Sequence, residues 1–358
     1  MNIFLRSSIR KGARSGALKS ERDRALRSGR ARALILCAAV ALLLALMFVS
    51  VMMGAVKIKP GDIWRILSGA PARASDARIL LYVRLPRVFC ATLSGAALAC
   101  SGAILQTALG NPMCGPNIIG ANAGAGLAIV ALAALFPGAA GFAPIAAFLG
   151  ALLAVSVVYA IAKKTGASGL AVILAGIAIS GLFSALTDLV ITLYPQARAN
   201  RIDFLIGGFA GVSMASVRFA APYILFGLAA SFAMYMHIDA LALGDSVAAS
   251  LGLRVSLVRG VCIGLAALLA GSAISLAGLI GFVGLLVPHI AKAFAGYEHK
   301  YALPLSAALG GAFCLFCDII ARTLFAPFEA PVGIVMSLIG SPFFIWLVLS
   351  RRRRPSFD

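Results

Sequence analysis

The sequence predicts an all-α polytopic membrane protein, with about ten transmembrane helices and short re-entrant or surface helices between them. Of its 358 residues, 61% are hydrophobic and only 12% are charged, whereas about 25% of the residues of a soluble globular chain are charged. Its uncharged stretches reach the length of about 20 residues that a bilayer requires. This composition excludes a soluble enzyme, a disulfide scaffold and a disordered chain.

The net charge of +19 lies in the termini and between the apolar stretches. Basic segments that flank membrane spans mark the cytoplasmic side, so we expect a lipid bilayer and no nucleic acid as partner. Residues 1–32 hold ten basic side chains and predict a cytoplasmic tail, and residues 351–358 form a second basic cytoplasmic end. With both termini in the cytoplasm, the number of spans must be even.

The first spans can be placed in order within the membrane domain, residues 33–350. Ala33 to Val56 contains no charged residue and predicts span one. The 75 residues between Arg87 and Lys163 contain no Asp, Glu, Lys, Arg or His. They predict three spans, separated where glycine and proline break helices, at Gly110-Asn111-Pro112 and at Pro137-Gly138.

Four later spans are expected at Gly169 to Tyr194, Val217 to His237, Leu303 to Arg322 and Val332 to Ser350. Val261 to Ala291 is too long for one helix and predicts two short spans that turn near Gly278, Gly281 and Gly284, which brings the total to ten. Gly207 to Val212 is too short to cross a bilayer, and we expect it to be an external re-entrant or surface helix.

The loop from Lys57 to Arg87 departs from the positive-inside rule. It follows one span and should be external, yet it holds seven basic residues against Asp62 and Asp76. Either a function requires this charge outside, or the first span and the basic tail determine the topology regardless.

A series of motifs runs from Leu81 to Arg354. In order they are Arg84-Leu85-Pro86-Arg87, Ser101-Gly102 with Gln106, Asn111-Pro112 with Gly120 and Gly124, Gly281 to Leu285, Pro288-His289-Ile290, Asp318 to Arg322, Pro331-Val332-Gly333 and Gly340 to Phe344. Together they resemble the FecCD-type permeases, the membrane subunits of ABC importers for iron-siderophores, haem and vitamin B12.

The resemblance implies a homodimer in the bacterial plasma (inner) membrane, two cytoplasmic ABC ATPase subunits and an external substrate-binding protein. It implies an iron chelate, haem or cobalamin-like cargo, without distinguishing among these or an oxyanion. The chain has no Gly-Lys dipeptide and therefore lacks a P-loop. We expect a non-catalytic transport subunit without a cofactor of its own, with ATP and Mg bound by the ATPase partner.

Residues 239–253 are the expected contact with the ATPase, and we call them the coupling segment. Asp245 is placed to cap a short helix through Leu251, and Gly252 to end it in the left-handed conformation. The segment matches the coupling region of the family, which implies that the ATPase-coupling residues are Leu243, Gly244, Asp245, Ser246, Ala249, Leu251 and Gly252. The alternative is an ordinary interfacial helix between two spans.

Arg84, Arg87 and Arg322 are candidates for docking the binding protein. They lie at the start of span two and the end of span nine, so all three should share the external surface. A guanidinium binds carboxylates through paired hydrogen bonds, and in the family matching positions receive glutamates of the binding protein. The alternatives are snorkelling anchors and an internal pair of Arg322 with Asp318.

Thr165 and Ser168, before span five, and Asp188, within it, are candidates for the translocation pathway and its gate. The resemblance implies that spans five and ten line the pathway at the dimer axis. A carboxylate inside a membrane is a functional candidate, although Asp188 could instead pair with Arg198 or Arg201. A rival function is a proton-coupled secondary transporter that uses Asp188 and Asp318.

No metal site is expected. Cys314 and Cys317 form a C-x-x-C within an apolar span without a second pair, and the seven cysteines lie mostly in apolar stretches. His289 lacks the partner at i+4 that a metal-binding helix needs, and we interpret it as a contact at a helix end.

Overall fold

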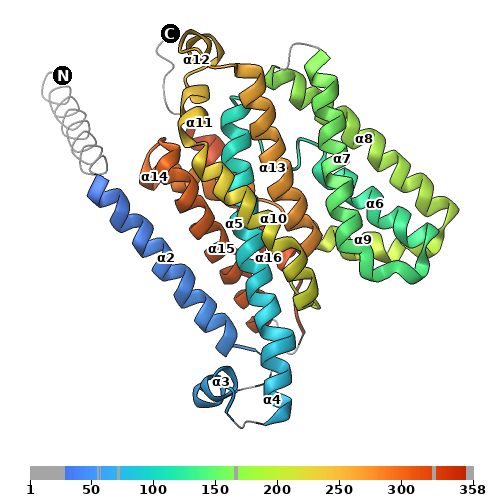
Figure 1. Ribbon diagram of the computed structural model, residues 1–358. Helices are drawn as coiled ribbons and strands as arrows, with labels where there is room; N and C mark the ends of the chain where they lie inside the picture. Colours follow the sequence, from blue (N-terminus) through green and yellow to red (C-terminus); the bar gives the residue numbers. More distant parts are fainter. Residues whose placement is uncertain are drawn as a thin grey trace, which may run out of the picture.

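The computed structural model describes residues 29–54, 56, 58–70, 73–164, 168–324 and 328–351, and every regular element in these ranges is a helix (Figure 1). The helix α12 (Asp245–Ser250) lies at one end of the molecule, which we call the α12 end. The helices α3 (Pro60–Leu67) and α4 (Ala74–Ile79) lie at the opposite end, which we call the α3 end. Most of the predicted N-terminal tail, residues 1–28, lies outside the described residues.

The remaining helices run mainly between these two ends. In chain order they are α2 (Gly29–Met52), the π-helix η1 (Leu80–Arg84), α5 (Leu85–Ala108), α6 (Ala121–Leu135), the 3-10 helix η2 (Pro137–Phe142), α7 (Ala143–Lys164), α8 (Gly169–Leu193), the 3-10 helix η3 (Pro195–Ala197), α9 (Arg198–Ile206), α10 (Met214–Ala233), α11 (Tyr235–Ala242), α13 (Val255–Ala277), α14 (Val283–Ala295), α15 (His299–Thr323) and α16 (Val332–Arg351).

Ten of these helical segments fit the predicted spans. Within the described ranges, seven are long and apolar enough to cross a membrane: α2, the continuous helix from α4 through α5, η2 with α7, α8, α10, α13 and α15. Three shorter apolar helices, α6, α14 and α16, complete the set. The predicted breaks are also confirmed, because α5 ends at Ala108, α6 ends at Leu135, and α13 and α14 are separated by a turn that begins at Gly278.

The predicted helix at Gly207 to Val212 is wrong. The short helix is α9, and the chain leaves it at Gly207, where φ is +58°. The loop that follows pairs with the turn between α13 and α14: the Gly208 amide donates to the Ala277 carbonyl (2.8 Å) and the Leu279 amide to the Phe204 carbonyl (2.9 Å). These long-range bonds replace the helical ones, and they leave no room for a side chain at Gly207.

The helix α5 occupies the centre of the fold, where it packs against α13, α14 and α15. Small residues allow this packing. A Cβ atom at Gly102 would overlap the carbonyl group of Gly284 on α14, and one at Gly95 would overlap that of Gly310 on α15. The hydroxyl of Ser101 donates to the Ala266 carbonyl of α13 (2.8 Å). In lipid, such close backbone approach and interhelical hydrogen bonds are what drive helix association.

We expect Gly102→Ala to destabilise the chain by about 1–3 kcal/mol, because the added methyl group must push α5 away from α14. The loss should appear as a lower thermal midpoint of the purified protein in detergent. Gly264→Ala, in α13, is the matched control, because a Cβ there has open space around it. Equal midpoints for Gly102→Ala and the wild type would show that the contact is not tight.

Candidate functional site

A cluster of charged residues at the α3 end joins α5, α15 and the loop before α16. The Nε of Arg87 donates to Oδ1 of Asp318 (2.9 Å), and its Nη1 donates to Oε2 of Glu329 (2.8 Å). Arg322 approaches the second oxygen of Asp318 at 3.1 Å. The side chain of Asp318 is fully buried, so the two guanidiniums supply the charge compensation that a buried carboxylate requires.

The other arginines of this region hold the end of α2. Arg84 donates to the carbonyls of Val51, Met52 and Val56. Arg322 donates to the Met53 carbonyl (2.9 Å) and to the Ser50 hydroxyl (2.8 Å). Carbonyls at a helix C-terminus lack intrahelical partners and carry partial negative charge, so guanidiniums are favoured there.

The three predicted docking arginines therefore share the α3 end, but each is already bound within the chain. Arg322 makes the internal pair with Asp318 that the sequence left open. The sequence analysis did not single out Glu329. The one indication in the sequence was that Glu329 is acidic and lies just before the motif that begins at Pro331. Its contact with Arg87 could not be predicted, because the two residues are far apart in the chain. The side chain of Glu329 is 48% exposed, whereas that of Arg87 is 8% exposed.

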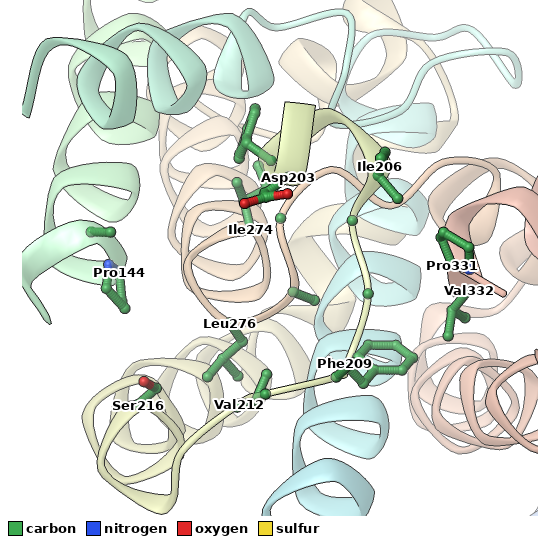
Figure 2. Close-up of a pocket in the computed structure, with 18 of the residues that line it drawn as sticks. Pro144, Asp203, Ile206, Phe209, Val212, Ser216, Ile274, Leu276, Pro331 and Val332 are labelled. Atoms are coloured by element: carbon green, nitrogen blue, oxygen red, sulfur yellow. The ribbon is translucent and has the colours of Figure 1, made fainter. Parts of the chain in front are cut away.

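A cavity of about 600 Å³ opens beside this cluster. It lies between the loop after α9, the end of α13 and the loop before α16 (Figure 2). Arg87, Asp203 and Glu329 contribute charge to its wall, whereas Phe209 and Leu276 are among its apolar side chains. Its volume and mixed lining fall within the usual range of small-molecule sites.

The coupling segment lies at the α12 end and contains the second half of α11 and all of α12. Gly252 ends α12 with φ +83°, which confirms the predicted left-handed stop. The predicted cap is wrong: Asp245 is the first residue of α12 and makes no side-chain cap. Its carboxylate instead accepts a hydrogen bond from Nη2 of Arg259 at 2.5 Å. A guanidinium carries a full positive charge, whereas the amides at a helix N-terminus carry only a partial one, so the pair with Arg259 is the stronger interaction.

The helix α12 presents an apolar edge to solvent. The side chains of Leu243, Val247 and Leu251 are 60%, 45% and 65% exposed, and Ser246 and Ala249 are exposed beside them. Ala248 alone is buried, and Arg259 anchors the segment by donating from Nε to the Ala108 carbonyl at the end of α5 (2.8 Å). An exposed apolar helix that is held from behind is suited to contact another protein.

Only part of the predicted gate can be placed. Ser168 caps α8 by accepting from the Ala171 amide (3.2 Å), whereas Thr165 lies outside the described residues. Asp188 forms an ion pair with Arg201 of α9, one of the two partners considered from the sequence, and its side chain is 62% exposed. This pair connects α8 to the short helix beside the cavity.

Cys314 and Cys317 are fully buried in α15. Over the described ranges, no group of three or more His, Cys, Asp or Glu side chains is arranged to hold a metal ion. His289 lies in the middle of α14, so the predicted contact at a helix end is wrong.

Comparison with known proteins places this arrangement in a family. The FecCD transport family matches residues 42–350. The Fe(3+)-citrate import system permease protein YfmE of Bacillus subtilis is 33% identical over 87% of this chain and 94% of its own length. The cobalamin import system permease protein BtuC of Halobacterium salinarum is 38% identical over 76% and 73%. A solved structure assigned to the metal-chelate type of ABC transporter, in an inward-facing conformation, is 28% identical, has a TM-score of 0.77 and covers 88% of this chain and 99% of its own. The chain belongs to the FecCD transport family.

Proposed function

We propose that this chain is the membrane-spanning permease subunit of an ABC importer, driven by ATP that a separate subunit hydrolyses. The observation that carries the proposal is α12, an exposed helix with an apolar edge that Arg259 connects to α5 and α13. Such a helix can receive force from a partner and pass it to the spans. Family membership and the names of the relatives, which are import-system permease proteins, support the same function.

The α12 end is the cytoplasmic side in this proposal, and the membrane is the bacterial plasma (inner) membrane. Basic residues favour this orientation by the positive-inside rule. Lys163 and Lys164 end α7 just before α8. The first residue of α8 borders a second cavity together with Asp245 of α12 and Lys292, so these lysines lie at the α12 end. The described start of α2 lies at the same end, which is consistent with an N-terminus in the cytoplasm.

The cargo in this proposal is an iron chelate or a cobalamin-like compound, delivered by an external binding protein. The relatives' names cover Fe(3+)-citrate, Fe(3+)-hydroxamate and cobalamin import. The cavity with Arg87, Asp203 and Glu329 in its wall is the proposed entrance, because it borders the arginine cluster at the α3 end, which is the external side in this proposal.

A second copy of the chain completes the pathway in this proposal. The helix α8 exposes Leu174 and Ile177 (57% and 60%), and α16 exposes Ile334 and Leu338 (50% and 66%). In an isologous dimer the same surface of both copies forms the interface, so these apolar side chains of α8 and α16 would contact the corresponding helices of the second copy around a two-fold axis. Asp188 on α8 and Ser168, which caps that helix, would then lie beside the pathway.

Docking of the binding protein would use Arg87, with Arg84 and Arg322 holding the surrounding backbone. Arg87 borders the cavity, and one nitrogen of its guanidinium donates a hydrogen bond to the half-exposed side chain of Glu329. A carboxylate of the binding protein can replace that partner without uncovering Asp318. Docking then exchanges one charge-assisted hydrogen bond for another.

We expect Glu329→Gln to raise the affinity for the binding protein by about tenfold at low ionic strength, because Arg87 no longer has to release a competing carboxylate. Biolayer interferometry on the importer complex measures this change, which should shrink as salt screens the charges. Glu298→Gln is the control. Glu298 also pairs with an arginine, but it lies just before α15 at the α12 end, far from the proposed docking site. Unchanged affinity in Glu329→Gln would contradict the docking role.

We expect Leu251→Asp to weaken ATPase binding by about thirtyfold or more, because a charge then has to be desolvated at the centre of the contact. Copurification of the ATPase and titration of the complex in nanodiscs measure the loss. Ser250→Ala, at a neighbouring exposed position, should leave the binding unchanged.

Reconstitution tests the function itself. Vesicles that hold the chain, its ATPase and the binding protein should accumulate the ferric chelate only when ATP is present on the ATPase side. Uptake by the chain alone, driven by a pH gradient, would overturn the proposal and favour the carrier alternative with Asp188 and Asp318.

A further inference from the structure

The helices α5 and α15 lie against each other over their length, and three contacts hold them in register. At the α3 end Arg87 binds Asp318. Near the middle Gly95 and Gly310 bring the two backbones into direct contact. At the α12 end the Thr107 hydroxyl lies 2.8 Å from Nε2 of His299. We call these two helices the α5–α15 pair. A pair fixed at both ends and at the middle cannot slide without breaking close packing.

His299 connects this pair to the coupling segment. It is the first residue of α15, and 2% of its surface is exposed. Its backbone amide donates to Oδ1 of Asp239 (2.9 Å), and its Nδ1 lies 2.6 Å from the same oxygen. Asp239 belongs to α11, which leads directly into α12. One imidazole therefore contacts α11 through one nitrogen and α5 through the other.

The chemistry of the contacts determines how the ring is held. A carboxylate can only accept, so Nδ1 carries the hydrogen that points to Asp239. In the neutral ring, Nε2 then accepts from the Thr107 hydroxyl. In the protonated ring, Nε2 donates to that hydroxyl, which in turn donates to the Ala103 carbonyl (3.2 Å). Both ring nitrogens keep a partner in either state, so the connection between α11 and α5 is maintained.

We propose that His299 is a positioning residue that connects the coupling segment to the α5–α15 pair, and that this pair carries motion between α12 and the arginine cluster at the α3 end. The inference rests on the proposed function. Displacement of α12 by the ATPase moves Asp239, and with it the ends of α5 and α15 that His299 holds. The opposite ends of the same two helices carry Arg87 and Asp318. Because binding couplings are reciprocal, docking at that cluster must also act on the ATPase.

The first experiment measures ATP hydrolysis by the full complex in nanodiscs, with and without the binding protein. We expect His299→Ala and Asp239→Ala to reduce the stimulation by the binding protein by about tenfold. Basal hydrolysis and subunit copurification should stay unchanged in His299→Ala, because His299 lies outside the coupling segment. Asp239→Asn should retain the stimulation, because its amide oxygen still accepts both hydrogen bonds. A purely structural loss would lower the amount of assembled complex instead.

His237→Ala is the matched control. His237 lies on α11 two residues before Asp239 and therefore on nearly the opposite face of that helix, is exposed, and takes no part in the network. Full stimulation in His299→Ala, or equal loss in Asp239→Asn and Asp239→Ala, would overturn the inference.

The second experiment uses the chain alone in detergent and therefore does not depend on the partners. Amide hydrogen exchange should accelerate in the first turn of α15 and in α11 for Asp239→Ala, and stay at the wild-type rate for Asp239→Asn and His237→Ala. Unchanged exchange in Asp239→Ala would show that His299 does not hold the segment. If exchange responds but the wild-type complex hydrolyses no ATP, the proposed function fails while the connection through His299 stands.

Discussion

The close backbone contact of α5 with its neighbours is the constraint on which the rest of the structure depends. Lipid surrounds the spans, so the burial of apolar side chains does not by itself favour one helix neighbour over another. Gly102 against Gly284 and Gly95 against Gly310 instead bring backbones within van der Waals contact. Each glycine position determines which helix lies on which face of α5. The polar contacts at both ends of the molecule can form only because these helices are so close.

Charge then determines the register of the helices. Asp318 is fully buried and would be costly without partners, and Arg87 and Arg322 both reach it. A shift of α15 along α5 by one turn, about 5.4 Å, would break the bond from Arg87 and leave Asp318 with only Arg322 of its own helix as a partner. At the α12 end, His299 holds α11 through Asp239, and Arg259 holds α12 through Asp245. The two working surfaces are therefore fixed to the same central helix.

Much of the fold could be predicted from the sequence. Span lengths follow from uncharged stretches, and the breaks at Pro112 and Pro137 follow from local backbone chemistry. Gly252 as a helix stop is of the same kind, since it depends only on its own φ. The errors arose where a long-range bond overrode a local preference. Asp245 is suited to cap a helix, but Arg259 offers a stronger partner.

The chain by itself determined that it lies in a membrane, how many spans it has and about where they lie, and which residues resemble a permease. These properties depend on composition and on neighbours in sequence, which a reader of the sequence can see. Only the tertiary structure decided that Glu329 binds Arg87, that Asp239 binds His299, and that Gly207 follows a helix instead of forming one. Each of these depends on two segments that are far apart in the chain, and helix packing alone brings them within hydrogen-bonding distance.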